Sequence, residues 1–186
     1  LSSGKTKMIA LIVPTLNNSF FGQLADGCQR FLIPQGYNLI IYSSEEYAHR
    51  ELSIIQAIDQ RRVEGLILSG SGFFIDNYQE VLSKITIPLV VVENFTEASH
   101  ISSVYIDDVA GITLASQYLI DQGHKKIGVI AGHRKMLTTD RRIKAVKSIF
   151  KQHHIPFNGK HIVYGDYSSF QSGAQALEKL MKNPCQ

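Results

Sequence analysis

The sequence is poor in cysteine, in long apolar runs and in net charge, and each shortage excludes a class of protein. Its two cysteines, Cys28 and Cys185, stand far apart in 186 residues. Cys28 falls on the apolar face of an expected helix, so we expect no disulfide framework and a reducing, cytoplasmic compartment. No window approaches the roughly 18 consecutive apolar residues of a membrane span, and no secretory signal pattern is visible. The formal net charge of +3 is too small to indicate nucleic-acid binding by this segment.

Catalytic and metal-binding motifs are also missing from the sequence. It contains no G-x-S-x-G, H-E-x-x-H or C-x-x-C pattern, and its histidines show no ligand spacing. The glycine-rich segment Ser69–Gly72 follows an expected strand, but it has neither the G-x-G-x-x-G pattern nor the Walker lysine of phosphate-binding loops. We therefore expect no enzyme, no metal and no cofactor.

The sequence does contain a regular alternation of strand and helix patterns. Apolar runs of strand length, the first at Met8–Pro14, alternate with segments whose apolar residues recur at helical spacing. This order predicts an α/β fold with parallel sheets and right-handed crossovers. The polar segment Glu93–Ser103 interrupts the alternation and marks the expected change of subdomain. The other strands are expected at Tyr37–Tyr42, Gly65–Leu68, Leu89–Val92, Val104–Ile106, Ile127–Ala131 and Ile162–Tyr164.

Three local features are expected between these strands. Pro34 and Gly36 should end the first helix near Leu32 or Ile33. Ser43 and Glu46 have the spacing of a capping box for the next helix. A last helix is expected to hold four apolar residues at helical spacing: Ala174, Leu177, Leu180 and Met181.

Ligands of open α/β sheets bind outside the carboxyl ends of the strands, so the loops after strands are the expected site. The first loop, Thr15–Phe21, holds Asn17 and Asn18, whose amides can donate and accept hydrogen bonds. Phe20 adds a flat apolar surface beside them. A helix N-cap at Asn18 or Ser19 explains part of this pattern, but adjacent phenylalanines on a helix cannot both face one core. We interpret the loop as one wall of a small-molecule site.

Later strand ends supply further candidates, among them Ser69. Glu93-Asn94 and Asp107-Asp108 could serve acid/base chemistry or cation binding, although helix capping explains at least one of the aspartates. The segment His133–Arg142 is a solvated basic helix face, or else one of its arginines grips hydroxyls or a carboxylate with its fork of donors. In Asp166-Tyr167, the tyrosine can stack on a sugar ring or a base.

Six segments follow one another in a characteristic order and spacing: IALIVPTLNNSFFGQLADGC, RRVEGLIL, IPLVVVEN, SSVYIDDVAGITLASQYLIDQGHKKIGVIAG, RRIKAV and VYGDYSSFQSGAQAL. Together they resemble the effector-binding domain of lactose-repressor (LacI/GalR) type transcription regulators, which share their fold with periplasmic sugar-binding proteins. The resemblance implies two Rossmann-like subdomains of periplasmic-binding-protein type I with the effector between them. The N-terminal subdomain would span residues 8–106. Residues 107–186 would form part of the second, and residues 1–7 would be the tail of a hinge segment.

The resemblance also implies, position by position, which residues contact the effector. Glu93 replaces the aspartate of the family's strand-end D-R pair, with Asn94 in place of the arginine, which suggests an unusual effector. Arg142 takes the place of the arginine that grips a sugar or base, and Tyr167 that of the stacking aromatic. The complete set of candidate contacts is Asn17, Asn18, Phe20, Ser69, Glu93, Thr138, Arg142 and Tyr167.

The leading interpretation is the ligand-sensing domain of a DNA-binding transcriptional repressor. Its effector would be a sugar, a sugar phosphate or a nucleobase, and the sequence does not distinguish them. Operator DNA would be bound through a helix-turn-helix that is not in this chain, with Leu1 as the hinge residue that wedges into the minor groove. A homodimer would match paired half-sites, and no membrane partner is expected. The alternative is a solute-binding protein of a sugar transporter, against which the absent signal peptide and the hinge-like start argue.

Overall fold

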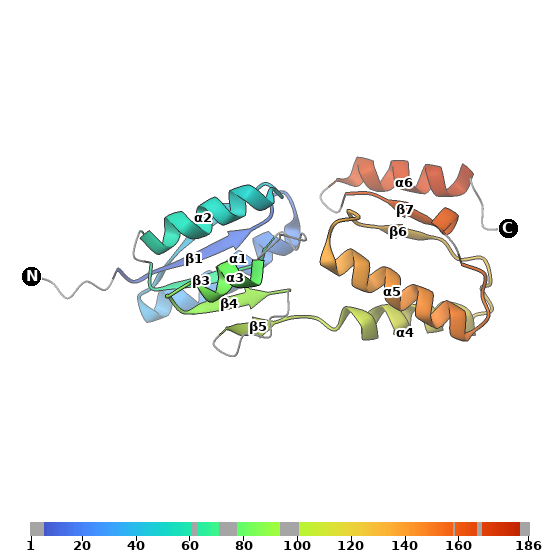
Figure 1. The fold of residues 1–186 in the computed structure, drawn as a ribbon, viewed down its shortest axis with the longest axis horizontal. Coiled ribbons are helices and arrows are strands. Elements are labelled where there is room, and N and C mark those ends of the chain that lie inside the picture. The colour runs from blue at the N-terminus through green and yellow to red at the C-terminus, as the bar shows by residue number, and fades with distance from the viewer. Residues whose placement is uncertain are drawn as a thin grey trace, which may run out of the picture. The chain divides into compact units, whose positions relative to one another are not determined.

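The computed structural model describes residues 6–60, 63–70, 78–93, 101–157, 159–166 and 169–182. The chain forms two compact units, Leu1–Ile106 and Asp107–Gln186, and each has its own parallel sheet (Figure 1). The first sheet has the strand order β2-β1-β3-β4-β5. Its strands are β1 (Met8–Val13), β2 (Asn38–Ser43), β3 (Gly65–Leu68), β4 (Leu89–Val92) and β5 (Ser102–Val104). The helical segments of this unit are α1 (Ser19–Leu32), η1 (Ile33–Gln35), α2 (Ala48–Gln60) and α3 (Tyr78–Ser83).

Strand β1 is the centre of the first unit because it is buried on both faces. It pairs in parallel with β2 along one edge and with β3 along the other. Side chains alternate across a strand, so Ala10 and Ile12 pack in the core cluster that contains residues of α2 and α3. Leu11 and Val13 pack in the opposite cluster, with residues of α1. A continuous apolar run is what such a strand requires.

The second unit is built around a two-stranded parallel sheet of β6 (Val129–Ala131) and β7 (Ile162–Tyr164). Its helical segments are α4 (Asp108–Asp121), α5 (Leu137–Gln152), η2 (Gly159–His161) and α6 (Phe170–Lys182). Within this unit, α5 and α4 lie on one side of the strand pair and α6 on the other (Figure 1). Val146, Ile149 and Phe150 of α5 form a core with Ile112 and Ile120 of α4.

The predicted fold class is confirmed, because both sheets are parallel and strands alternate with helices as expected. The expected strands at Gly65–Leu68, Leu89–Val92 and Ile162–Tyr164 agree with β3, β4 and β7. The first helix ends at Leu32, as predicted, and Pro34 lies in the short η1 segment that follows.

Two local predictions are wrong, and both fail where the backbone turns. The strand expected at Val104–Ile106 is β5, Ser102–Val104. Its partner β4 ends at Val92, and Glu93 then adopts a left-handed φ of 65°, so residues after Val104 have no β4 partner. The predicted capping box does not form. Ser43 closes β2, and its hydroxyl accepts a hydrogen bond from the Glu45 backbone N–H at 3.3 Å, well before α2 begins.

The expected last helix is α6, and most of the apolar residues expected on it are exposed. Ala176 is the buried residue of α6, whereas Leu177 is 51% exposed and Met181 is exposed as well. Leu180 is half-buried and packs against the backbone of Gly128. The contact is so close that a Cβ atom added to Gly128 would lie 2.7 Å from Cδ2 of Leu180. Helical spacing shows which residues share a face, but the two-stranded sheet covers only part of the apolar surface of α6.

Cys28 is a free cysteine on α1, and burial raises the pKa of its thiol. Cys185 lies outside the described residues. Among the helices that the structure describes, none has the length and the apolar character needed to cross a membrane.

The buried strands should dominate the stability of the first unit. Leu68→Ala removes a side chain that is 0% exposed, so we expect the free energy of unfolding to fall by about 2–5 kcal/mol. Leu16→Ala makes the same change at a side chain that is 59% exposed, so it should change stability by no more than about 0.5 kcal/mol. Urea unfolding followed by circular dichroism measures both values. Equal losses would contradict the core assigned to β3.

Candidate functional site

The loop after β1 and the start of α1 hold one capping residue and two exposed candidate contacts. The Asn18 side chain is the N-cap of α1 and accepts a hydrogen bond from the Phe20 backbone N–H at 3.0 Å. Asn17 is exposed, and its backbone N–H donates to the Thr15 hydroxyl at 3.2 Å. Phe21 is 8% exposed and enters the core, whereas Phe20 is 39% exposed. The expectation that the two phenylalanines face different ways is confirmed.

Two more candidates lie at neighbouring strand ends of the same sheet. Ser69 follows β3 and is completely buried. Its backbone N–H donates to the Ile12 carbonyl at 2.9 Å, but its hydroxyl has no hydrogen-bond partner in the described part of the chain. Glu93 follows β4 in a left-handed conformation, and its backbone N–H donates to the Val104 carbonyl at 2.8 Å.

The sheet topology brings these residues to one edge. Strands β1, β3 and β4 are neighbours and run parallel, so the residues that follow them lie at one end of the sheet. Asn17, Asn18, Ser69 and Glu93 therefore share this edge. A buried hydroxyl without a partner is rare in folded proteins, which makes Ser69 the most unusual polar group of the four.

In the second unit, Arg142 takes part in a cluster of charges that the sequence analysis missed. The Asp108 side chain, 8% exposed, accepts a hydrogen bond from Arg142 Nε at 2.7 Å through Oδ1. Its Oδ2 atom accepts one from Arg141 Nη2 at 3.2 Å. Asp107 next to it caps α4 by accepting from the Ala110 backbone N–H at 2.9 Å, so the prediction that one of the two aspartates is a cap is confirmed.

Helices α4 and α5 run parallel, so their N-termini lie together. The ion pairs of Asp108 join the first turn of α4 to the second turn of α5. At the other end, the Gln117 side chain of α4 and His153 after α5 form a hydrogen bond of 2.9 Å. Thr138 and Thr139 lie in the first turn of α5. Thr138 is half-buried, and the buried Thr139 hydroxyl has no hydrogen-bond partner among the described residues.

The loop before α5 is held against the end of β7. The guanidinium of Arg134 lies 4.3 Å from the ring centroid of Tyr164, the last residue of that strand. The backbone N–H of Asp166 donates to the Ser172 hydroxyl at 2.8 Å. Two of the predicted site residues, Tyr167 and Leu1, lie outside the described residues.

The described side chains at these strand and helix ends are mostly hydrogen-bonding groups. No group of three or more histidine, cysteine, aspartate or glutamate side chains gathers as a metal site within the described ranges. Amides, hydroxyls and guanidinium groups at strand and helix ends are donors and acceptors for a polar small molecule. No local sequence pattern indicates the partnership of Asp108 with Arg141 and Arg142, because these residues lie more than thirty positions apart.

Parallel sheets with polar residues at their carboxyl ends define a class of small-molecule-binding proteins. One family model matches residues 6–185, and it describes periplasmic binding proteins and the sugar binding domain of the LacI family. The chain belongs to this family.

Curated relatives match along nearly the whole chain. Catabolite control protein A of Priestia megaterium is 31% identical over 98% of this chain and 54% of the relative. The HTH-type transcriptional repressor PurR of Vibrio vulnificus is 28% identical over 97% of this chain and 54% of the relative. The chain thus spans about half the length of the curated relatives it matches. These relatives are transcriptional regulators and not enzymes, in agreement with the sequence analysis.

Solved structures agree in fold. The transcription regulator CcpA of Lactococcus lactis superimposes with a TM-score of 0.79 and 24% identity, over 94% of this chain and 64% of the other. A LacI-family sugar-binding regulator from Escherichia coli, solved with phosphate, gives a TM-score of 0.82 at 22% identity, over 98% of this chain and 66% of the other.

The structural role of Asn18 as a helix cap can be tested separately from its proposed role in ligand binding. Asn18→Ala removes the N-cap of α1, so the free energy of unfolding should fall by about 0.5–2 kcal/mol. Asn18→Ser restores a capping hydroxyl and should recover most of it. Asn17→Ala is the matched control at an exposed position and should leave the melting temperature unchanged. A larger loss from Asn17→Ala than from Asn18→Ala would overturn the capping assignment.

Proposed function

We propose that the chain is the ligand-sensing part of a DNA-binding transcriptional repressor. Two observations support this: the membership of the LacI-related family and the regulators among its relatives. In this proposal a small effector binds the chain and changes the affinity of a separate domain for operator DNA, which is a coupling between two distinct sites.

The proposed effector is a sugar-like molecule or a nucleobase. The contacts proposed in the first unit are Asn17, Asn18, Phe20, Ser69 and Glu93. Those in the second are Thr138, Arg142 and Tyr167. The observation that carries the binding proposal is the Ser69 hydroxyl, which is fully buried and has no partner among the described residues. An effector hydroxyl or amide would satisfy it.

The proposed protein is cytoplasmic and acts as a homodimer, because paired operator half-sites call for two-fold symmetry. Operator DNA is bound by a helix-turn-helix outside this chain, with Leu1 as the hinge residue at the minor groove. These assignments follow from the resemblance to LacI/GalR-type regulators and from the relatives named as repressors.

A solute-binding protein of a sugar transporter is the second candidate, because the matching family also includes periplasmic binding proteins. The codons upstream of residue 1 in the gene distinguish the two. If these codons encode a helix-turn-helix, the regulator is supported. If they encode a signal peptide, the transport protein is the correct function.

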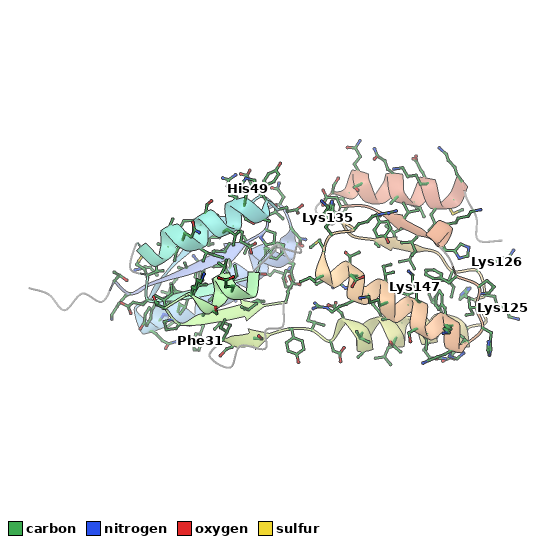
Figure 2. The ribbon with its side chains drawn as sticks, viewed as in Figure 1. Phe31, His49, Lys125, Lys126, Lys135 and Lys147 are labelled. Atoms are coloured by element: carbon green, nitrogen blue, oxygen red, sulfur yellow. The ribbon has the colours of Figure 1, made fainter. Side chains whose placement is uncertain are left out.

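Arg142 gives the most direct test of the proposed binding site. A thermal-shift screen against sugars, sugar phosphates and purines should give at least one ligand that raises the melting temperature. Arg142→Ala should abolish that shift, and Arg142→Lys should weaken it, because lysine keeps the charge but loses the fork of donors. Lys147→Ala, at an exposed position of α5 (Figure 2), is the control and should retain the full shift. A full shift in Arg142→Ala would refute the assignment of Arg142.

A further inference from the structure

The charges around Arg142 are arranged in a way that bears on which effector it can accept. Asp108 is nearly buried, and each of its two carboxylate oxygens accepts a hydrogen bond from a different arginine. A carboxylate in the first turn of a helix is favoured by the helix dipole alone. Two guanidinium partners are more than that role requires, so the carboxylate also serves the arginines.

Two other carboxylates at this end of the two helices have partners of their own. Asp107 caps α4 at 2.9 Å, and Asp140 pairs with Lys144 at 2.8 Å. Asp108 is therefore the carboxylate that Arg141 and Arg142 share in the described part of the chain.

We propose that Asp108 is a specificity-determining residue of the effector site, which makes the chain bind a neutral, hydroxyl- or amide-bearing effector and reject its phosphorylated counterpart. The inference rests on the proposed function, in which Arg142 contacts the effector. It narrows the effector from sugars, sugar phosphates and nucleobases to the uncharged members of these classes.

The physical reason is the cost of an unpaired buried charge. A phosphate that takes the guanidinium of Arg142 for itself must compete with Asp108, and the two anions repel each other at such short range. If the phosphate displaces Asp108, a nearly buried carboxylate loses a partner, which is strongly unfavourable. A hydroxyl or an amide carbonyl accepts a hydrogen bond from a guanidinium without removing the counter-ion.

Matched ligand pairs test the proposal on the full-length protein. Ribose with ribose 5-phosphate, glucose with glucose 6-phosphate and adenosine with adenosine monophosphate differ only in the phosphate. Isothermal titration calorimetry should give, for the pair that binds, an affinity at least tenfold higher for the neutral member. A phosphorylated member that binds as tightly as its neutral partner would overturn the inference and leave the proposed function intact. Absence of binding by every sugar, phosphate and nucleobase in the panel would overturn both.

Substitutions then assign the preference to Asp108. Asp108→Asn removes the negative charge with little change of shape, so the ratio of neutral to phosphorylated affinity should fall at least tenfold. Asp108→Glu keeps the charge and should retain the preference, even if either variant melts earlier. Asp121→Asn is the matched control, because it makes the same change at the exposed far end of α4. If Asp108→Asn and Asp121→Asn give the same ratio, Asp108 does not determine specificity. The preference measured on the unchanged protein still tests the neutral-effector inference if Asp108→Asn fails to fold.

Discussion

The burial of β1 on both faces is the constraint on which the first unit depends. Strand β1 pairs in parallel with β2 and β3, so strands that run the same way satisfy its backbone hydrogen-bonding groups. Leu11 and Val13 pack on one face, and Ala10 and Ile12 on the other. Helices must therefore cover both sides, and the residues that follow neighbouring strands meet at one edge. Asn17, Asn18, Ser69 and Glu93 lie at this edge because strands β1, β3 and β4 end there.

Buried polar groups connect this architecture to the proposed function. A folded chain ordinarily pairs its buried donors and acceptors, yet the Ser69 hydroxyl has no partner among the described residues. In the second unit, the buried carboxylate of Asp108 is paired twice, with Arg141 and Arg142. In the proposed function, Ser69 forms a hydrogen bond with the effector, and Asp108 restricts the charge that the effector carries. Both follow from burial, which makes an unmatched polar or charged group costly.

Predictions of secondary structure from the sequence were most accurate where a single local pattern determines the structure. Apolar runs predicted β3, β4 and β7 with their observed bounds. The helix-cap preference predicted a cap at Asn18 or Ser19, and the cap is Asn18. Predictions failed where the rest of the fold decides. The Ser43 and Glu46 spacing suits a capping box, but Glu45 and Glu46 adopt left-handed φ angles and form a turn. Helical spacing indicated α6, but it did not show which of its apolar residues are buried, and Leu177 and Met181 are exposed.

By itself the sequence determined the fold class, the order of the elements and the candidate polar residues, because periodicity and composition are local properties of the chain. Its resemblance to LacI/GalR-type regulators was carried by the same local segments. Only the tertiary structure decided which polar groups are buried and how they are paired. Asp108 shares no local pattern with Arg141 and Arg142, and the three meet because α4 packs parallel to α5. The charge at the proposed effector site is thus a consequence of helix packing that no local pattern contains.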